Sequence, residues 1–143
     1  MTGTVLVRDA LADELERLPR IAETAVPPEV ATAGGAVEPG KLADQLGGDR
    51  VFVAECDGRR AGYAAVSQRA GTLVLDQLVV AATDQGRHVG HRLLDWVEGY
   101  GVSQGLSAVQ VPTAGVDARA RDFYLRRGYV ARAGVMEREL VHL

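Results

Sequence analysis

Cysteine is almost absent from the sequence: Cys56 is the only one among 143 residues. An internal disulfide is therefore impossible, which is typical of proteins from a reducing compartment. The sequence also lacks any apolar run close to the ~20 residues that a membrane-spanning helix needs. Its first residues do not have the basic and apolar pattern of a signal peptide. We expect a cytoplasmic protein that does not contact a membrane.

Lysine is equally scarce, since Lys41 is the only one and arginine supplies the other basic residues. The 16 basic and 19 acidic residues give a net charge of −3. This balance argues against a nucleic-acid-binding protein, which usually carries a basic face. Four arginines lie close together late in the chain, and we interpret them as a solvated helix face: Arg119, Arg121, Arg126 and Arg127.

The length of 143 residues and the apolar share of 47% are usual for one soluble domain. We therefore expect a single domain over residues 1–143. The first third of the chain has the weakest pattern. It predicts a strand over residues 5–7, a helix over 11–25 that Pro19 interrupts, an irregular loop over 26–37 and a short helix over 41–46.

The middle of the chain has the pattern of β structure. Residues 51–56, 62–66 and 73–80 are apolar strands, and the pair Asp57-Gly58 is typical of a tight hairpin. We predict an antiparallel meander of three strands.

After residue 80 the pattern changes to helices that alternate with strands. Val89, Leu93 and Val97 mark one face of a helix. The pattern then predicts a strand over 108–111, a helix over 117–128, and strands over 129–132 and 135–141. A strand that returns after a helix favours a parallel crossover. The predicted fold class is α/β (α+β type), with one mixed, mostly antiparallel sheet of about six to seven strands flanked by about four helices.

The most informative segment joins a strand to a helix through a turn that contains glycine, from Gln85 to His91. The first N–H groups of a helix have no internal partners, and the helix dipole places partial positive charge there. Glycine lets a ligand approach the backbone closely. Together these features predict a cradle for a diphosphate. The spacing fits neither the nucleoside-triphosphate loop nor the dinucleotide fingerprint.

Residues 85–90 resemble the Arg/Gln-x-x-Gly-x-Gly/Ala signature of the GNAT superfamily of acyl-CoA-dependent N-acetyltransferases. The resemblance implies that the turn holds the diphosphate of coenzyme A through Gln85, Gly86, Arg87, His88, Val89, Gly90 and His91. His88 stands where the signature has its first glycine. A backbone donor is retained there, but a Cβ crowds the approach.

Two further segments are similar to the same family. Leu78, Val79 and Val80 resemble its Leu-x-Val strand end, whose backbone binds pantetheine as if it were another strand. Residues 120–129 resemble its Ala-x-x-Phe-Tyr-x-x-x-Gly-Phe segment, and Asp117 takes the place of the usual asparagine at the head of that helix. The resemblance therefore implies the acyl-CoA N-acyltransferase fold, with acetyl-CoA as co-substrate.

The implied reaction is the attack of a free amine on the acetyl thioester. Tyr124, in the matched segment, is implied as the general acid for the leaving thiolate. Asp76 is the best-placed carboxylate for a base, but the ordinary aspartate pKa of about 3.9 is low for that task. A water chain is the alternative. Gln77, expected on the opposite face of the strand, cannot act as a base, and the backbone N–H of Leu78 or Val79 is the expected oxyanion donor.

Other candidate residues have plainer interpretations. Cys56 is predicted in the core. A catalytic metal would need a tighter cluster of ligands than His88, His91 and Asp95 provide. The turn is also predicted to bind phosphate, so we expect no metal. Trp96 is either a core residue or part of a dimer contact. A late arginine that binds the adenosine 3′-phosphate is the alternative to a solvated face.

Three functions are compatible with these residues. The first is transfer of an acetyl group to a primary amine of a small molecule or a protein. The second is a non-catalytic module that binds acyl-CoA, and the third is a transferase for a different acyl-CoA. The sequence leaves open the identity of the amine acceptor and the oligomeric state, including a homodimer.

Gly90→Glu tests the predicted cradle. The added carboxylate repels the diphosphate, so the affinity for coenzyme A is expected to fall by about tenfold or more. Calorimetric titration measures this change, and thermal unfolding of the variant checks that it is folded. An unchanged affinity would show that the diphosphate binds elsewhere.

Overall fold

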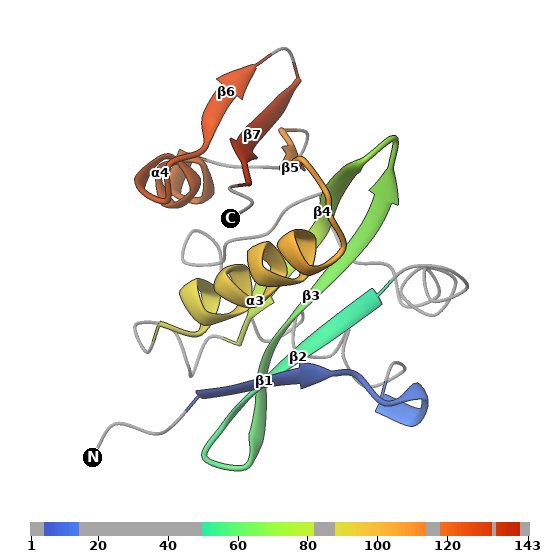
Figure 1. Cartoon of the computed structure of the whole chain (residues 1–143). Coiled ribbons are helices and arrows are strands. Elements are labelled where there is room, and N and C mark those ends of the chain that lie inside the picture. Colours follow the sequence, from blue (N-terminus) through green and yellow to red (C-terminus); the bar gives the residue numbers. More distant parts are fainter. Residues whose placement is uncertain (1–4, 15–49, 82–87, 114–117, 133, 141–143) are drawn as a thin grey trace.

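The protein folds around one seven-stranded sheet (Figure 1). The computed structural model describes residues 5–14, 50–81, 88–113, 118–132 and 134–140. In spatial order the strands are β1 (Val5–Asp9), β2 (Arg50–Cys56), β3 (Arg59–Arg69), β4 (Thr72–Val80), β5 (Ala108–Pro112), β7 (Val135–Glu139) and β6 (Val130–Arg132). All neighbouring strands are antiparallel except β4 and β5, which are parallel. The predicted mixed, mostly antiparallel sheet is confirmed.

The described residues contain two α-helices, α3 (Val89–Ser103) and α4 (Ala118–Arg126), and a 3-10 helix, η1 (Ala12–Glu14). The prediction of about four helices is therefore too high for this part of the chain. The remainder of the helix predicted over 11–25, the loop over 26–37 and the helix over 41–46 lie outside the described residues. No described helix has the length and apolar composition needed to cross a membrane.

Tight turns build the predicted meander. Asp57 and Gly58, between β2 and β3, both have positive φ, at 55° and 78°. This is the combination that a two-residue hairpin loop favours, because it matches the twist of the strands. Ala70 and Gly71 form the next turn with φ of 50° and 79°. The Asp-Gly pair was thus a reliable sign of the first hairpin.

Helix α3 covers one face of the sheet (Figure 1). Its periodic apolar face is the buried one, as predicted, and four of its side chains are at most 1% exposed: Val89, Leu93, Leu94 and Val97. They pack with strand residues that point to the same face, including Phe52, Leu73, Leu75 and Leu78. Full burial of a Val or Leu side chain contributes about 1.5–3 kcal/mol. This packing fixes where the first turn of α3 lies.

A buried carboxylate ties η1 to the first strands. Glu14 is 2% exposed and accepts hydrogen bonds from both Nη atoms of Arg8, at 2.6 and 2.9 Å. Arg60 Nε and the Leu11 N–H also donate to it, at 2.5 and 2.9 Å. The bonds from Arg8 are the main reason that the pKa of Glu14 lies well below its ordinary range. This cluster holds the end of β1 against β3.

Gly62 in β3 lets the start of α3 lie close to the sheet. A Cβ at this position would lie 2.5 Å from the carbonyl oxygen of Val79. It would also lie 3.2 Å from Leu93 Cδ1 and 3.3 Å from Val89 Cγ1. No side chain fits in this space unless the helix or the strand moves.

Gly62→Ala is therefore expected to destabilise the protein by about 1–3 kcal/mol, as other overpacked core substitutions do. Gly99→Ala is the matched control, because Gly99 is on α3 and an added Cβ would meet no atom within 4 Å apart from its chain neighbours and the backbone of its own helix. Alanine there should stabilise the helix by about 0.5–1 kcal/mol. Urea unfolding measures both effects. Equal shifts for the two variants would contradict the close packing at Gly62.

Candidate active site

β4 and β5 are joined over only a short length. Their parallel pairing comprises three residue pairs: Thr72 with Ala108, Leu73 with Val109 and Val74 with Gln110. Beyond Val74, β4 stays paired with β3, but no strand in the described part of the chain pairs with its other edge. Backbone groups that point to this edge need another partner. The predicted pantetheine-binding residues Leu78, Val79 and Val80 lie on this part of β4.

Asp76 lies at a β-bulge in β4. Ala65 and Val66 are adjacent in β3, but their partners in β4 are Gln77 and Leu75, which leaves Asp76 as the extra residue. Regular alternation predicts Asp76 and Gln77 on opposite faces, and the bulge breaks that alternation. Asp76 is half-buried and Gln77 is buried. The bulge lies two residues beyond Val74, the last residue of β4 that pairs with β5. A bulge bends its strand.

His88 precedes α3 in a left-handed conformation, with φ 64° and ψ 21°. This region favours glycine, which explains why a glycine suits this position of the signature. The first helical hydrogen bond joins the Arg92 N–H to the His88 carbonyl at 3.0 Å. The N–H groups of Val89, Gly90 and His91 thus have no partner within the helix, and together with its dipole they can bind an anion. Three other predicted cradle residues, Gln85, Gly86 and Arg87, lie outside the described residues, as does Asp117, the predicted coenzyme-binding residue at the head of the next helix.

Gly90 lies where α3, α4 and the end of β4 meet. A Cβ at Gly90 would lie 3.6 Å from Phe123 Cζ in α4 and 3.6 Å from Val80 Cγ2. One residue further along α3, the His91 ring centroid lies 4.8 Å from that of Phe123. The start of α3, the open edge of β4 and α4 are therefore neighbours in space.

Tyr124 follows Phe123 in α4 and has no exposed surface. Its hydroxyl has no hydrogen-bond partner among the described residues, and burial raises its pKa. The ring packs edge-on against Phe123 and Tyr129, at centroid distances of 5.2 and 5.5 Å. An unpaired buried hydroxyl costs about 1–3 kcal/mol, so such groups are uncommon and call for an explanation. Contact with a bound ligand would provide one.

His88 and His91 belong to no cluster of possible metal ligands within the described ranges. In the described ranges, no three His, Cys, Asp or Glu side chains are grouped so that they could hold an ion. Burial, with the positive charges of Arg127 and His88, lowers the pKa of His91. These effects favour the neutral imidazole of His91, whose ring packs on Phe123.

The late arginines fall into two groups. Three of them are exposed, as predicted for a solvated helix face: Arg119, Arg121 and Arg126. Arg127 corrects that prediction, because its side chain is only 14% exposed. It donates hydrogen bonds to two carboxylates of α3, at 2.6 Å to Asp95 and 3.1 Å to Glu98. The sequence pattern missed these residues because it does not show that α3 lies beside the end of α4.

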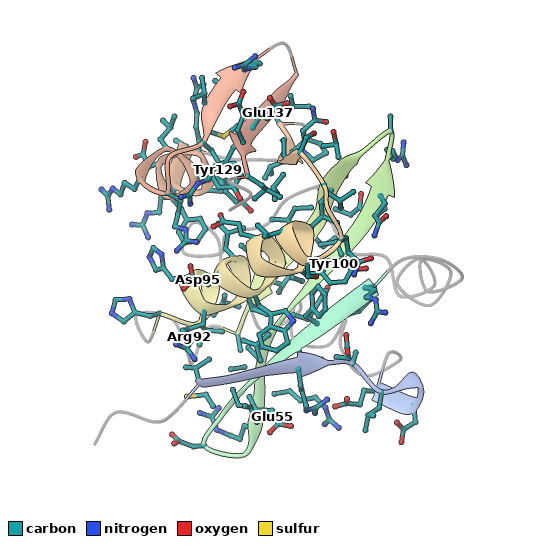
Figure 2. The ribbon with its side chains drawn as sticks, in the orientation of Figure 1. Glu55, Arg92, Asp95, Tyr100, Tyr129 and Glu137 are labelled. Atoms are coloured by element: carbon teal, nitrogen blue, oxygen red, sulfur yellow. The ribbon has the colours of Figure 1, made fainter. Side chains whose placement is uncertain are left out.

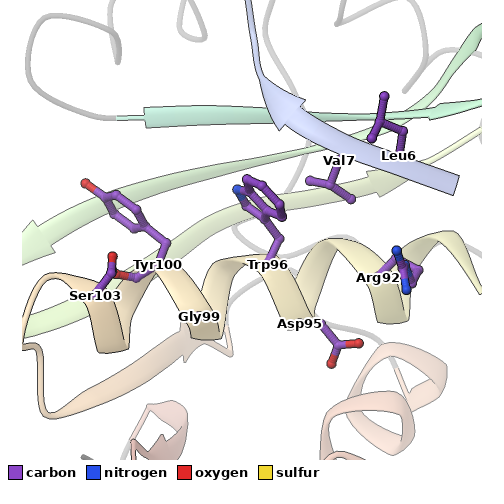
Figure 3. A pocket seen from close by; sticks show the side chains of 8 residues that line it. All are labelled: Leu6, Val7, Arg92, Asp95, Trp96, Gly99, Tyr100 and Ser103. Carbon is purple, nitrogen blue, oxygen red and sulfur yellow. The ribbon is translucent and has the colours of Figure 1, made fainter.

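A separate groove of about 530 Å³ lies on the β1 side of α3 (Figure 3). Its apolar wall includes Leu6, Val7, Trp96 and Tyr100. Trp96 is 45% exposed and is therefore not a core residue. Its alternative role in a dimer contact stays a prediction. The groove contains none of the predicted catalytic or coenzyme-binding residues.

Solved structures with the same fold span almost the whole chain. An acetyltransferase assigned to the GNAT family from Desulfovibrio desulfuricans is 24% identical, with a TM-score of 0.79 over 96% of this chain and 100% of that one. The ribosomal-protein-S18-alanine N-acetyltransferase of Escherichia coli is 14% identical, with a TM-score of 0.79 over 98% and 96%. The PaiA N-acetyltransferase of Thermoplasma acidophilum, solved with coenzyme A, is 17% identical, with a TM-score of 0.75 over 95% and 99%.

No curated protein sequence matches the chain. The family model of the acetyltransferase (GNAT) domain, however, matches residues 21–142, which include the β4 edge, the start of α3 and α4. The match extends over most of the chain and agrees with the fold of the solved structures. The chain belongs to the GNAT family of acetyltransferases.

Proposed function

We propose that the protein transfers the acetyl group of acetyl-CoA to a primary amine of a small molecule or a protein, in the cytoplasm. The observation that carries this proposal is the hydroxyl of Tyr124, which is buried and has no partner among the described residues. It lies in a helix that contacts the start of α3, close to the edge of β4 that no described strand covers.

The described residues suit the parts of acetyl-CoA. The edge of β4 that no described strand pairs with, at Leu78, Val79 and Val80, offers main-chain groups to the amides of pantetheine, in the way that a sheet edge accepts a peptide. The N–H groups of Val89 and Gly90, which have no partner within the helix, suit the diphosphate. Bound acetyl-CoA supplies the activated acyl group. The protein must orient this group, accept a proton from the amine and donate a hydrogen bond or proton to the leaving sulfur.

Tyr124 is the proposed donor to the leaving sulfur. Because burial raises its pKa, the hydroxyl is protonated throughout the neutral range and always able to donate. A thiol has a pKa of about 8.5, below that of such a phenol, so full transfer of the tyrosine proton to the thiolate is energetically unfavourable. Its main contribution is therefore a hydrogen bond that grows as negative charge develops on the sulfur.

The amine must also lose a proton. Asp76 is the proposed acceptor of this proton, either directly or through water. It lies at the bulge of β4, the strand proposed to bind the thioester arm. An ordinary aspartate is a weak base, so we favour a water that Asp76 orients. The backbone N–H of Leu78 or Val79 is the proposed oxyanion donor.

The fold does not select the acceptor, because structures less than 25% identical share architecture rather than substrates. The Escherichia coli neighbour acts, by its name, on an alanine of a ribosomal protein. The main alternative is a non-catalytic module for acyl-CoA. His88, a non-glycine residue in a left-handed conformation, is the observation that favours it. A preference for another acyl-CoA is the third case.

Tyr124→Phe tests the proposed reaction. Release of thiol from acetyl-CoA, measured over a panel of amines, is expected to fall by on the order of 10²-fold. The Kd for coenzyme A should rise by no more than about fivefold, the contribution of one hydrogen bond, since packing of the ring is retained. Tyr100→Phe is the matched control, because its hydroxyl contacts Gln68 on the other side of α3.

The results separate the three functions. Equal thiol release by Tyr124→Phe and wild type removes Tyr124 from the mechanism. Binding of coenzyme A without thiol release for any amine favours the non-catalytic module. Faster release from a longer acyl-CoA supports the third function. A wild-type protein that does not bind coenzyme A at all rules out all three.

His88→Gly tests whether the cradle uses main-chain donors. Glycine relieves the left-handed strain, so stability is expected to rise by about 1 kcal/mol, while the Kd for coenzyme A stays within about threefold. His91→Gly is the control: it places glycine inside the helix, removes the contact with Phe123 and should destabilise by about 1 kcal/mol. Thermal unfolding and calorimetric titration measure both variants. Tenfold weaker binding by His88→Gly would mean that the imidazole itself holds the ligand.

A further inference from the structure

The carboxylate of Glu98 in α3 accepts hydrogen bonds from three side chains that come from two other segments of the C-terminal half. The Tyr129 hydroxyl donates to Glu98 Oε2 at 2.8 Å. Arg127 Nη2 and Arg138 Nη1 both donate to Glu98 Oε1, at 3.1 Å each. These partners come from the turn after α4 and from β7. Glu98 therefore connects α3 with the turn after α4 and with β7. Strand β7 lies on the far side of the place where β4 and β5 separate.

This connection is largely shielded from water. The side chains of Glu98 and Arg127 are each 14% exposed, and Tyr129 is 2% exposed. Hydrogen bonds to a charged group are stronger than neutral ones, and shielding strengthens them further. Burial and the negative charge of Glu98 raise the pKa of Tyr129, so its hydroxyl stays protonated and continues to donate. Figure 2 shows Tyr129 beyond the end of α4 and Asp95 on α3.

Two of the residues that Glu98 holds also hold the backbone of Tyr124. The N–H groups of Arg127 and Tyr129 both donate to the Tyr124 carbonyl, at 3.0 Å each. The turn between them closes at Gly128, whose φ of 90° is in the left-handed region. The ring of Tyr129 also packs edge-on against that of Tyr124.

The Tyr124 hydroxyl has no hydrogen bond of its own to fix its position among the described residues. Its placement depends on the packing of its ring and on the backbone that carries it. A hydrogen bond is effective only when the donor–acceptor distance is within a few tenths of an ångström of its optimum. The groups that set the end of α4 therefore decide where this hydroxyl lies.

We propose that Glu98 is a positioning residue, which holds Tyr129 and Arg127 so that the Tyr124 hydroxyl meets the sulfur of bound coenzyme A. This inference rests on the proposed function. Glu98 itself touches neither coenzyme A nor the amine in this scheme. Its effect on the reaction passes through Tyr124.

The test compares the affinities of the full-length protein for coenzyme A and for desulfo-coenzyme A, which lacks the sulfur atom. The ratio of the two Kd values isolates the contact with sulfur and needs no knowledge of the amine. In the wild type, the hydrogen bond from Tyr124 to the sulfur should make coenzyme A bind about fivefold more tightly than desulfo-coenzyme A. Tyr124→Phe should bring the ratio close to one, and Glu98→Gln should bring it below about two.

Asp95→Asn is the matched control. Asp95 is the other carboxylate partner of Arg127, but within the described part of the chain the Tyr129 hydroxyl bonds to Glu98 and not to Asp95, so the ratio should stay near the wild-type value. Tyr129→Phe removes the neutral donor alone and should lower the ratio as Glu98→Gln does. It also keeps the test informative if changes at Glu98 prevent folding.

A double substitution separates positioning from general stability. If Glu98 acts through Tyr124, then Glu98→Gln in the Tyr124→Phe background should not change the ratio further. A loss of stability in Glu98→Gln with the wild-type ratio intact would overturn the inference, as would a wild-type ratio of one. In both cases the proposed function survives if the wild type binds coenzyme A. Absence of that binding would overturn both.

Discussion

Parallel strands β4 and β5 share three residue pairs and then part, and the rest of the candidate site follows from that separation. Every other pair of neighbouring strands with five or more residues has at least five pairs in register. Backbone groups at the edge of β4 that no described strand pairs with need partners as strongly as those in the other strands do. The opening is thus a place where the protein has main-chain hydrogen-bonding capacity that its own described strands do not use.

Two local features of β3 and β4 accompany this separation. The bulge at Asp76 bends β4 in the middle of its length. Gly62 of β3, which has no side chain, lets α3 press onto the sheet near the end of β4. Both features favour the same result, because they bring the start of a helix and the end of a bent strand to one place. Main-chain donors of α3 then lie next to main-chain groups of β4.

Local patterns predicted the elements of this arrangement well and their contacts poorly. The Asp57-Gly58 turn and the apolar face of α3 depend on neighbouring residues, and both were correctly predicted. The bulge at Asp76 was not, because Leu75 to Leu78 has no glycine or other local sign of an irregular strand. Arg127 was predicted on a solvated face, since its carboxylate partners are about thirty residues away in the chain. The special backbone at His88 was indicated only by resemblance to a glycine position.

Two tyrosines five residues apart show how the site differs from ordinary core packing. Tyr124 and Tyr129 are both buried and their rings touch. The Tyr129 hydroxyl has a carboxylate partner at 2.8 Å, whereas that of Tyr124 has none among the described residues. Ser67 Oγ and Arg127 Nε are also unpaired, but the Arg127 guanidinium is bound through another nitrogen. A phenylalanine would fill the place of Tyr124 without that cost, so its hydroxyl is better explained by a ligand than by the core.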